Sequence, residues 1–278
     1  MLAPQRQERI LTEVRARGAV RVTDLVAELA VSDMTVRRDI AQLADRGLVR
    51  RVHGGAVSPQ HTAHEPQFAT KRGLAAAQKL AIARAALAYV TPGGSIALSA
   101  GTTTHALAEL IAASPHLRPL TVVTNSVPVS DALHAAGRAT TAGDPHDLDV
   151  VLTGGTRTPS DALVGPVADA ALGQLRVDRL FLGVHGLGPS GLTTPNLLEA
   201  QTDRALVASA DEVLVLADRS KWAAVGLARI CGLDAVDVLL TDDLPDDVRA
   251  ATTAAVGRVE VVAGPGHDAA EPATPPTA

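Results

Sequence analysis

The chain has 278 residues, 46% of them hydrophobic and 1% aromatic, and a formal net charge of −5 at pH 7. This length allows two domains, and the apolar content excludes a wholly disordered chain. So few aromatic side chains argue against a base-stacking surface for single-stranded nucleic acid. The single cysteine, Cys231, excludes an intrachain disulfide and a cysteine-based zinc site, and we expect neither a metal nor a cofactor.

The first residues, MLAPQRQERILTEV, are charged and amphipathic from the start. They lack the long apolar stretch of a signal peptide or a membrane-spanning helix. We therefore expect a cytoplasmic protein with no membrane partner.

Charge is unevenly distributed along the chain. Residues 1–57 contain ten arginines and seven acidic residues, a net charge of +3, which leaves −8 for the remainder. A basic head on an acidic body predicts that only the head faces phosphates.

Three helical patterns open the chain. RQERILTEVRAR (6–17) has an amphipathic pattern that Gly18 ends, and we expect Thr23 to cap a second helix, DLVAELA (24–30). Ser32 can cap the third helix. The apolar positions of that third helix recur at i, i+4 and i+7: Val36, Ile40 and Leu43. These positions face the core, so Arg38 points away from it, with Thr35 and Arg37 on either side.

The third helix is followed by LVRRVHGGAV (48–57), which predicts two short strands around Gly54 and Gly55, a wing. Two short helices joined by a tight turn, with a wing, are typical of a winged helix-turn-helix. Arginine can bind guanine bidentately in the major groove. The alternative is that the arginines only solvate an exposed helix. The candidate DNA-binding residues are Ser32, Asp33, Met34, Thr35, Arg37, Arg38, Arg50, Arg51 and His53.

Residues 5–57 resemble the DNA-binding head of DeoR-type bacterial transcriptional regulators. The matching features are VS..TVRRD, the following L...G, and the ending R.HGGA. The resemblance implies double-stranded operator DNA as a partner and association with the nucleoid when bound.

A change of pattern separates the head from the rest. SPQHTAHEPQFATKR (58–72) lacks apolar periodicity and contains two prolines, as a linker does. We expect a DNA-binding domain over 1–57, a linker over 58–74, an effector-binding and oligomerisation domain over 75–263, and a disordered Pro/Ala-rich tail over 264–278.

Apolar runs of strand length alternate with Ala/Leu-rich helical patterns after the linker. The strand candidates are 95–100, 120–124, 149–153, 179–184, 212–217 and 236–241. Continuous apolar strands separated by single helices indicate parallel pairing with helices on both faces. The expected fold is therefore α/β: a winged helix-turn-helix followed by a doubly wound, mostly parallel α/β domain.

Small polar residues follow successive strands of this domain, where open parallel sheets bind ligands. Gly101, Thr102, Thr103 and Thr104 can hold a phosphate at a helix N-terminus, although an ordinary capped helix would look the same. The next three strands end at Asn125, at Gly154 and Gly155, and at His185 and Gly186. These loops together predict a polar pocket, with His185 as a polar wall and not a metal ligand, since no second histidine has coordinating spacing.

Two charged residues stand near this edge. Glu199 opens a helix, and Lys221 is one of three lysines in the chain, with Lys71 and Lys79. They can bind a sugar hydroxyl and a phosphate, or they are an ordinary helix-start glutamate and a solvated lysine.

Residues 65–242 resemble the DeoR-type effector domain through K.AIA..A, AGTTT, VVTNS, TGG, G.HG...SGLTT and LADRSK. The resemblance implies a fold related to ribose-5-phosphate isomerase and a phosphorylated sugar or related metabolite as ligand. By position it assigns the ligand role to Gly101, Thr102, Thr103, Thr104, Asn125, Gly154, Gly155, Gly186, Glu199 and Lys221. Many family members have aspartate where this chain has Ser99 and His185, which weakens a catalytic interpretation, because an aldose–ketose isomerase needs a carboxylate.

The expected function is a DNA-binding transcriptional regulator, a repressor of a carbohydrate-metabolism operon, that is not an enzyme. We expect a homo-oligomer, dimer or tetramer, because one short recognition helix contacts few bases. One alternative is a sugar-phosphate isomerase with an accessory DNA-binding head. Another is a body that only oligomerises and keeps a vestigial pocket.

Overall fold

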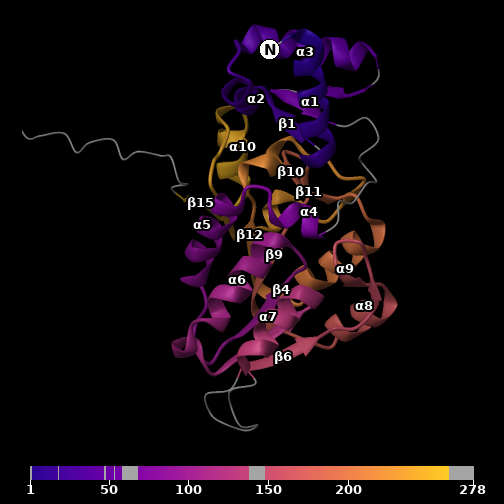
Figure 1. Cartoon of the computed structure of the whole chain (residues 1–278). Helices are drawn as coiled ribbons and strands as arrows, with labels where there is room; N and C mark the ends of the chain where they lie inside the picture. The colour runs from indigo at the N-terminus through magenta and orange to yellow at the C-terminus, as the bar shows by residue number, and fades with distance from the viewer. Residues whose placement is uncertain are drawn as a thin grey trace, which may run out of the picture.

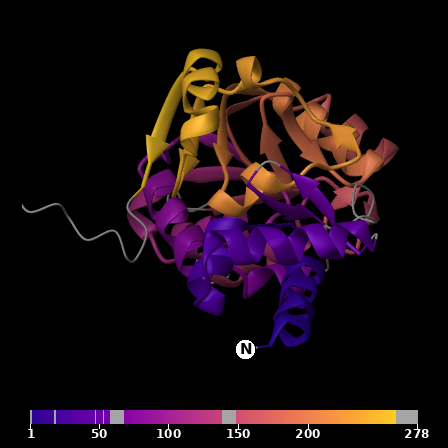
Figure 2. The same ribbon diagram turned by 90° about the horizontal axis from the view of Figure 1, so that it is seen from above.

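The computed structural model describes residues 2–17, 19–46, 48–52, 54–57, 68–137 and 148–262. The N-terminal residues form a helical head that lies on one end of a larger α/β body (Figure 1). The view from above shows the head across that end of the body, next to the segments that follow the central strands (Figure 2).

The head is a winged helix-turn-helix, as predicted. Its helices are α1 (Ala3–Arg17), α2 (Val22–Leu29) and α3 (Asp33–Asp45). The wing strands β2 (Arg50–Val52) and β3 (Gly55–Val57) are antiparallel, and β1 (Ala19–Arg21), which the sequence did not predict, completes their sheet. The predicted inward positions Val36, Ile40 and Leu43 lie in the core of the head, where they pack with residues of α1 and α2: Ile10, Val14, Leu25 and Leu29.

The predicted cap of α2 was wrong. Arg21 occupies the N-cap position and makes no side-chain cap bond, and Thr23 lies inside the helix. The helix begins early because β1 leads directly into it, with the Val22 amide donating to the Gly54 carbonyl across the small sheet. The predicted end of α1 at Gly18 lies outside the described residues.

The body is built on a seven-stranded sheet in which every neighbouring pair is parallel. The strands, from one edge to the other, are β15 (Arg258–Val261), β14 (Val238–Thr241), β12 (Ala210–Leu216), β9 (Val177–Gly183), β4 (Ser95–Leu98), β5 (Leu120–Thr124) and β6 (Leu148–Leu152). The six predicted strands are all present, and β15 adds an edge that the sequence analysis missed.

Helices cover both faces of the sheet. One face is covered by α5 (Ala76–Leu87), α6 (Thr102–Ala112) and α7 (Val127–Gly137), and the other by α8 (Pro166–Leu172), α9 (Leu197–Ala208) and α10 (Asp246–Ala255) (Figure 1). Side chains of one strand alternate between the two cores: Phe181 lies in the first, and Leu180 and Leu182 lie in the second. This confirms the doubly wound α/β prediction.

Several short elements were not predicted. α4 (Phe68–Arg72) lies within the predicted linker, whose residues 58–67 are outside the described residues, as is the predicted tail. Two small antiparallel groups lie beside the main sheet: β7 (Thr156–Arg157) with β8 (Leu163–Val164), and β10 (Gly186–Gly188), β11 (Gly191–Thr194) and β13 (Ala228–Arg229). The domain boundaries at 57 and 75 remain a prediction.

The carboxyl ends of the central strands face the head. The residues that follow β9, β12 and β14 include His185, Asp218 and Asp243, and these line a cavity whose other wall is the start of α2. An ion pair crosses between the two parts: Arg21 Nη1 lies 3.0 Å from Asp243 Oδ2. The body thus presents the carboxyl-end edge of its sheet to the helical head.

Candidate DNA-binding surface and candidate effector pocket

The N-terminus of α3 is closed by its own side chains. The Thr35 amide donates to Ser32 Oγ at 3.3 Å, and the two hydroxyl oxygens lie 2.8 Å apart. This confirms Ser32 as the N-cap. The cap fixes the first turn of the helix, which contains the candidate DNA-binding residues Asp33, Met34 and Thr35.

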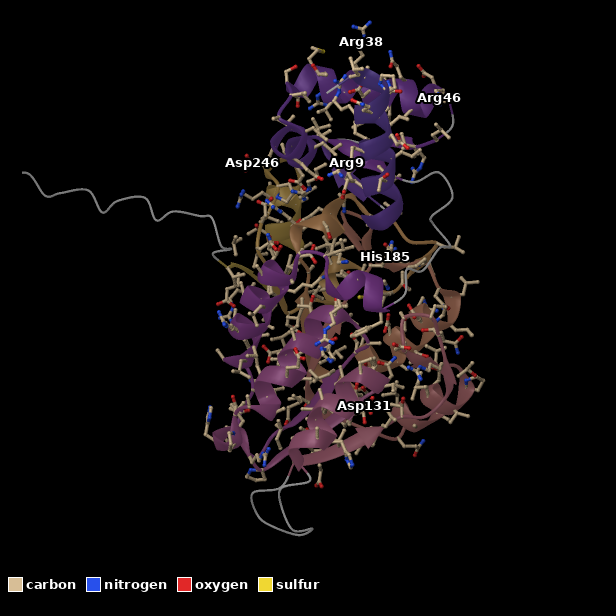
Figure 3. All side chains as sticks on the ribbon, viewed as in Figure 1. Arg9, Arg38, Arg46, Asp131, His185 and Asp246 are labelled. Carbon is tan, nitrogen blue, oxygen red and sulfur yellow. The ribbon has the colours of Figure 1, made fainter. Side chains whose placement is uncertain are left out.

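The two neighbouring arginines of α3 have different surroundings. Arg37 Nη2 donates to Asp33 Oδ2 at 3.2 Å, and this hydrogen bond, with the charge of Asp33, raises the pKa of Arg37. Arg38 is exposed and makes no hydrogen bond or ion pair with the described residues. Figure 3 places Arg38 at the outer end of the head, away from the body. Arg38 is therefore the arginine of α3 whose donors are available to DNA.

The opposite side of α3 is anchored by Asp39, which is 3% exposed. Arg6 of α1 donates to both carboxylate oxygens, with Nη2 3.3 Å from Oδ1, and Gln7 Nε2 donates to Oδ1 at 3.3 Å. The hydrogen bonding between Arg6 and Asp39, together with the charge of Asp39, raises the pKa of Arg6 against the effect of burial. The contacts fix the rotation of α3 about its axis, which decides where Arg38 points.

The wing places further basic side chains on the same part of the head. Arg50 and Arg51 are exposed on β2, and Met34, in the first turn of α3, is 74% exposed. His53 lies outside the described residues. The arginines of β2 thus stay candidates for phosphate contacts beside the recognition helix.

A small pocket lies at the carboxyl ends of the strands. It has a volume of about 70 Å³ and contains six of the predicted effector residues: Gly101, Thr102, Thr103, His185, Glu199 and Lys221. Phe68 and Lys71 of α4 close one side. We call this the strand-end pocket.

Glu199 is held in this pocket by hydroxyl groups. Its Oε1 accepts from Thr158 Oγ1 at 2.8 Å and from Ser160 Oγ, and its Oε2 accepts from Thr194 Oγ1 at 3.1 Å. Asn196 caps α9 and orients the first turn, in which Glu199 lies. The sequence analysis found Glu199 but missed all three hydroxyls. Thr158 and Ser160 lie between β7 and β8, 41 and 39 residues away from it, and Thr194 is the last residue of β11.

The loop between β4 and α6 is braced from below. Thr104 Oγ1 donates to the Ser99 carbonyl at 2.7 Å, and the Ala100 amide donates to Asn125 Oδ1 at 3.0 Å. Ser99 is buried, and its Oγ accepts from the Gly183 amide at 2.9 Å. These contacts leave Thr102 and Thr103 facing the pocket, at the N-terminus of a helix of 11 residues.

Five predicted effector residues do not line the strand-end pocket. Thr104 and Asn125 make the bracing contacts above. Gly154 and Gly155 form a turn with φ of 73° and 119°, and a Cβ on Gly155 would lie 2.7 Å from the Val164 carbonyl oxygen. A Cβ on Gly186 would lie 2.2 Å from the Ala224 carbonyl oxygen. In this structure these residues support the loops, and their predicted ligand contacts remain untested.

A larger cavity of about 940 Å³ lies between the body and the head, and we call it the interdomain cavity. It shares Lys71, His185 and Lys221 with the strand-end pocket. All three lysines of the chain line it, together with Arg21, Thr23, Asp24, Ala27, Glu28, Asp218, Arg219 and Asp243 among others.

Lys79 and Asp218 are the buried charges of this cavity. Burial and, to a smaller extent, the Lys221 ammonium lower the pKa of Lys79 to about 8, against the opposing charge of Asp218. Lys79 Nζ donates to the Lys71 carbonyl at 2.7 Å and to the Leu74 carbonyl. Burial alone would raise the pKa of Asp218. The positive charges of Lys221 and Lys79 and the hydrogen bonds donated by Ser220 together hold this pKa below its usual value.

Other kinds of site find little support among the residues described. No group of three or more histidine, cysteine or acidic side chains there could hold a metal ion. No helix there has the length and apolar content needed to cross a membrane.

Models of two protein families match the chain. A model described as the DeoR-like helix-turn-helix domain matches residues 6–62, and one described as the DeoR C terminal sensor domain matches residues 74–243.

Curated relatives are similar over most of the chain. It is 35% identical over 248 residues to the HTH-type transcriptional regulator GlpR of Haloferax volcanii, covering 88% of this chain and 92% of that protein. It is 33% identical, with the same coverage, to the uncharacterized HTH-type transcriptional regulator YgbI of Escherichia coli. It is 30% identical to the glycerol-3-phosphate regulon repressor of Haemophilus influenzae, over 87% of this chain and 91% of that one.

Among solved structures, ribose 5-phosphate isomerase A of Methanocaldococcus jannaschii aligns with a TM-score of 0.37 and 17% identity. The alignment covers 52% of this chain and 53% of the isomerase.

Proposed function

The chain belongs to the DeoR family of DNA-binding transcriptional regulators, and we propose that it represses a carbohydrate-metabolism operon until a phosphorylated sugar binds its body. On this proposal α3 and the wing bind double-stranded operator DNA, and the strand-end pocket binds the phosphate end of the effector. Such a protein works in the cytoplasm, where the DNA is.

One observation carries the DNA-binding role at the level of residues. Arg38 is exposed at the outer end of the head, while the core contacts of α3 and the Asp39 anchor fix its direction. Guanidinium donors held in a known direction suit bidentate recognition of guanine in the major groove. Arg50 and Arg51 then contact the phosphates beside the recognition helix.

The pocket supports an anionic, hydroxylated effector. Lys221 and Lys71 supply positive charge, and Thr102 and Thr103 supply hydroxyls at the N-terminus of α6, where helix amides favour a phosphate. The Glu199 carboxylate can accept hydrogen bonds from the hydroxyl groups of a ligand, and its position is already fixed by hydrogen bonds from Thr158, Ser160 and Thr194. A volume of about 70 Å³ suits a phosphate-sized group.

A sensor fits this pocket better than an isomerase does. Ser99 is buried and engaged with the Gly183 amide, so it supplies no acid or base to a ligand. Glu199 and Asp203 are the carboxylates that line the pocket. Three hydroxyl groups already donate to the oxygens of Glu199, which leaves them poorly placed to abstract a proton from carbon.

The regulator is expected to act as a homo-oligomer, a dimer or a tetramer. A single α3 reaches few base pairs, whereas two heads separated by a whole number of helical turns read two half-sites.

A binding experiment tests the proposal. The full-length protein is used to select sites from a random pool of double-stranded DNA, and the selected site is then titrated with sugar phosphates of three to six carbons. We expect a two-fold symmetric site, released by at least one sugar phosphate and not by the unphosphorylated sugar. No release by any of them would remove the effector class from the proposal. Turnover of a sugar phosphate that Glu199→Ala abolishes would instead favour the isomerase.

A further inference from the structure

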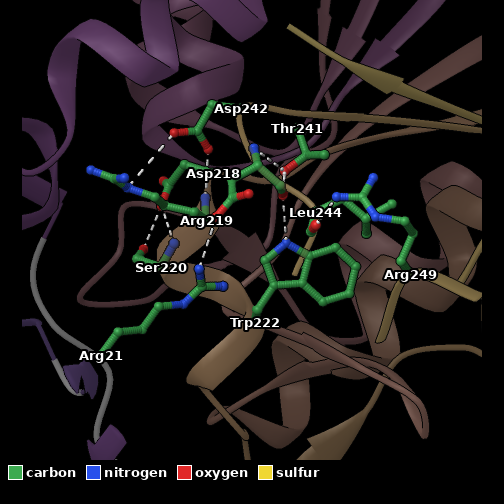
Figure 4. A network of polar contacts seen from close by, with 10 residues as sticks. Arg21, Asp218, Arg219, Ser220, Trp222, Thr241, Asp242, Leu244 and Arg249 are labelled. Carbon is green, nitrogen blue, oxygen red and sulfur yellow. Dashed lines mark hydrogen bonds and ion pairs between the residues drawn. The ribbon is translucent and has the colours of Figure 1, made fainter. Parts of the chain in front are cut away.

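Two residues that line the interdomain cavity each have a buried polar atom without a hydrogen bond. Among the described residues, Arg21 Nη2 and Asp218 Oδ2 are buried side-chain atoms with no hydrogen bond. Both residues line this cavity, Arg21 from the head and Asp218 from the body. Figure 4 shows the Arg21 side chain extending toward Asp218 and the segment around it.

In each of these two groups, the neighbouring terminal atom already has a partner. Arg21 Nη1 is paired with Asp243 Oδ2 at 3.0 Å, and Asp218 Oδ1 accepts from the Ser220 amide at 2.9 Å. Asp218 is only 1% exposed. A buried charged group that lacks a hydrogen bond carries a desolvation penalty, so such atoms indicate a missing partner.

The missing partner has to supply both kinds of hydrogen bond. Asp218 Oδ2, on a carboxylate held in its charged form, needs a donor, and Arg21 Nη2 needs an acceptor. A hydroxyl group provides both. The cavity therefore fits a ligand with several hydroxyls, such as the carbon skeleton of a sugar or a polyol.

The two cavities also fit one elongated ligand. The strand-end pocket, with about 70 Å³, suits a phosphate, while the interdomain cavity, with about 940 Å³, offers far more room for a carbon skeleton. Lys71, His185 and Lys221 line both and so mark the passage between them. A phosphate bound at the threonines would leave its carbon skeleton pointing toward the head.

We propose that the interdomain cavity is the subsite for the hydroxylated end of the effector, and that Arg21 of the DNA-binding head binds this end directly. This inference rests on the proposed sugar-phosphate effector and adds that the bound effector spans body and head. A ligand held by both parts has a different affinity for arrangements in which they separate, which is what coupling to DNA binding requires.

Isothermal titration calorimetry on the full-length protein tests this, with the same set of sugar phosphates and with inorganic phosphate. We expect Arg21→Gln and Asp218→Asn each to weaken sugar-phosphate binding by roughly tenfold or more, because each removes a hydrogen bond to a charged group. Neither variant should weaken the binding of inorganic phosphate to the same extent, because neither residue lines the strand-end pocket. Lys221→Met should weaken both ligands, because Lys221 lies in the phosphate pocket.

Arg176→Gln is the matched control, because it removes an arginine from an exposed ion pair with Asp211, and neither of these residues lines either cavity. It should keep sugar-phosphate affinity near that of the unmodified protein. If Arg21→Gln and Asp218→Asn bind sugar phosphates as tightly as the unmodified protein does, water satisfies the two atoms and the inference is wrong. If no sugar phosphate binds the unmodified protein at all, the proposed effector class fails, and the inference fails with it.

Discussion

Arg6 of α1 and Asp39 of α3 form an ion pair between side chains that are 11% and 4% exposed, and this pair sets the rotation of the recognition helix. We predict that Asp39→Asn lowers the thermal midpoint of unfolding by several degrees, because it removes one charge of an ion pair that lies at a nearly buried site. Operator affinity should fall as well, since Arg38 loses its fixed direction.

Asp45→Asn is the control for this variant, because Asp45 is an exposed acid at the end of the same helix. Differential scanning calorimetry and fluorescence anisotropy with the selected DNA measure the two effects. If Asp39→Asn and Asp45→Asn have the same thermal midpoint of unfolding, the ion pair between Arg6 and Asp39 does not stabilise the head.

Arg38 should contribute to sequence discrimination. Arg38→Ala is expected to cost about 1 to 3 kcal/mol at one base position of the operator and less on unrelated DNA. Arg37→Ala should cost less, because Asp33 already occupies the Arg37 guanidinium. Competition binding with operators changed at single positions separates the cases, and an equal loss on every sequence would make Arg38 a phosphate contact.

Asp33 places a negative charge next to the DNA-facing side of α3. Asp33→Asn should raise affinity for DNA of any sequence, since it removes that charge and frees Arg37. The gain should shrink as the salt concentration rises. Asp246→Asn, which changes an exposed acid at the start of α10 in the body, serves as the comparison. An unchanged affinity at low salt would show that Asp33 lies too far from the phosphates.

Lys79 should titrate near pH 8, well below an ordinary lysine. Its folded pKa is lower than its unfolded pKa, so the folded state loses this proton first as the pH rises, and stability increases between about pH 8 and pH 10.5. Phosphate affinity should fall over the same rise, because the cavity loses a positive charge.

Carbon-13 labelling of lysine tests this directly, because the chain contains only Lys71, Lys79 and Lys221. One of three signals should show a midpoint near pH 8, and Lys71→Arg should remove a different signal. Three midpoints near pH 10.5 would contradict the lowered pKa.

Local patterns predicted the parts of this molecule that depend on near neighbours. The spacing of Val36, Ile40 and Leu43 predicted their burial and the exposure of Arg38. The strand ends predicted that Gly101, His185 and Lys221 lie together, because parallel strands bring their carboxyl ends to one edge.

Contacts between distant residues escaped prediction for a physical reason. The pair of Arg21 with Asp243 joins positions 222 residues apart, and no spacing rule connects them. The hydroxyls that donate to Glu199 lie 41, 39 and 5 residues before it, and no helix or strand periodicity connects these positions. Thr23 was misplaced as a cap because β1 fixes the start of α2 through the wing, which the local sequence does not reveal.

The direction of the central strands has a consequence for how a signal travels. Since their carboxyl ends meet the start of α2 across the interdomain cavity, the proposed effector-binding edge lies directly next to the head. No relay through the body is required. Substitutions that uncouple effector binding from DNA release should therefore concentrate among the residues that line the interdomain cavity and be rare at the opposite end of the sheet.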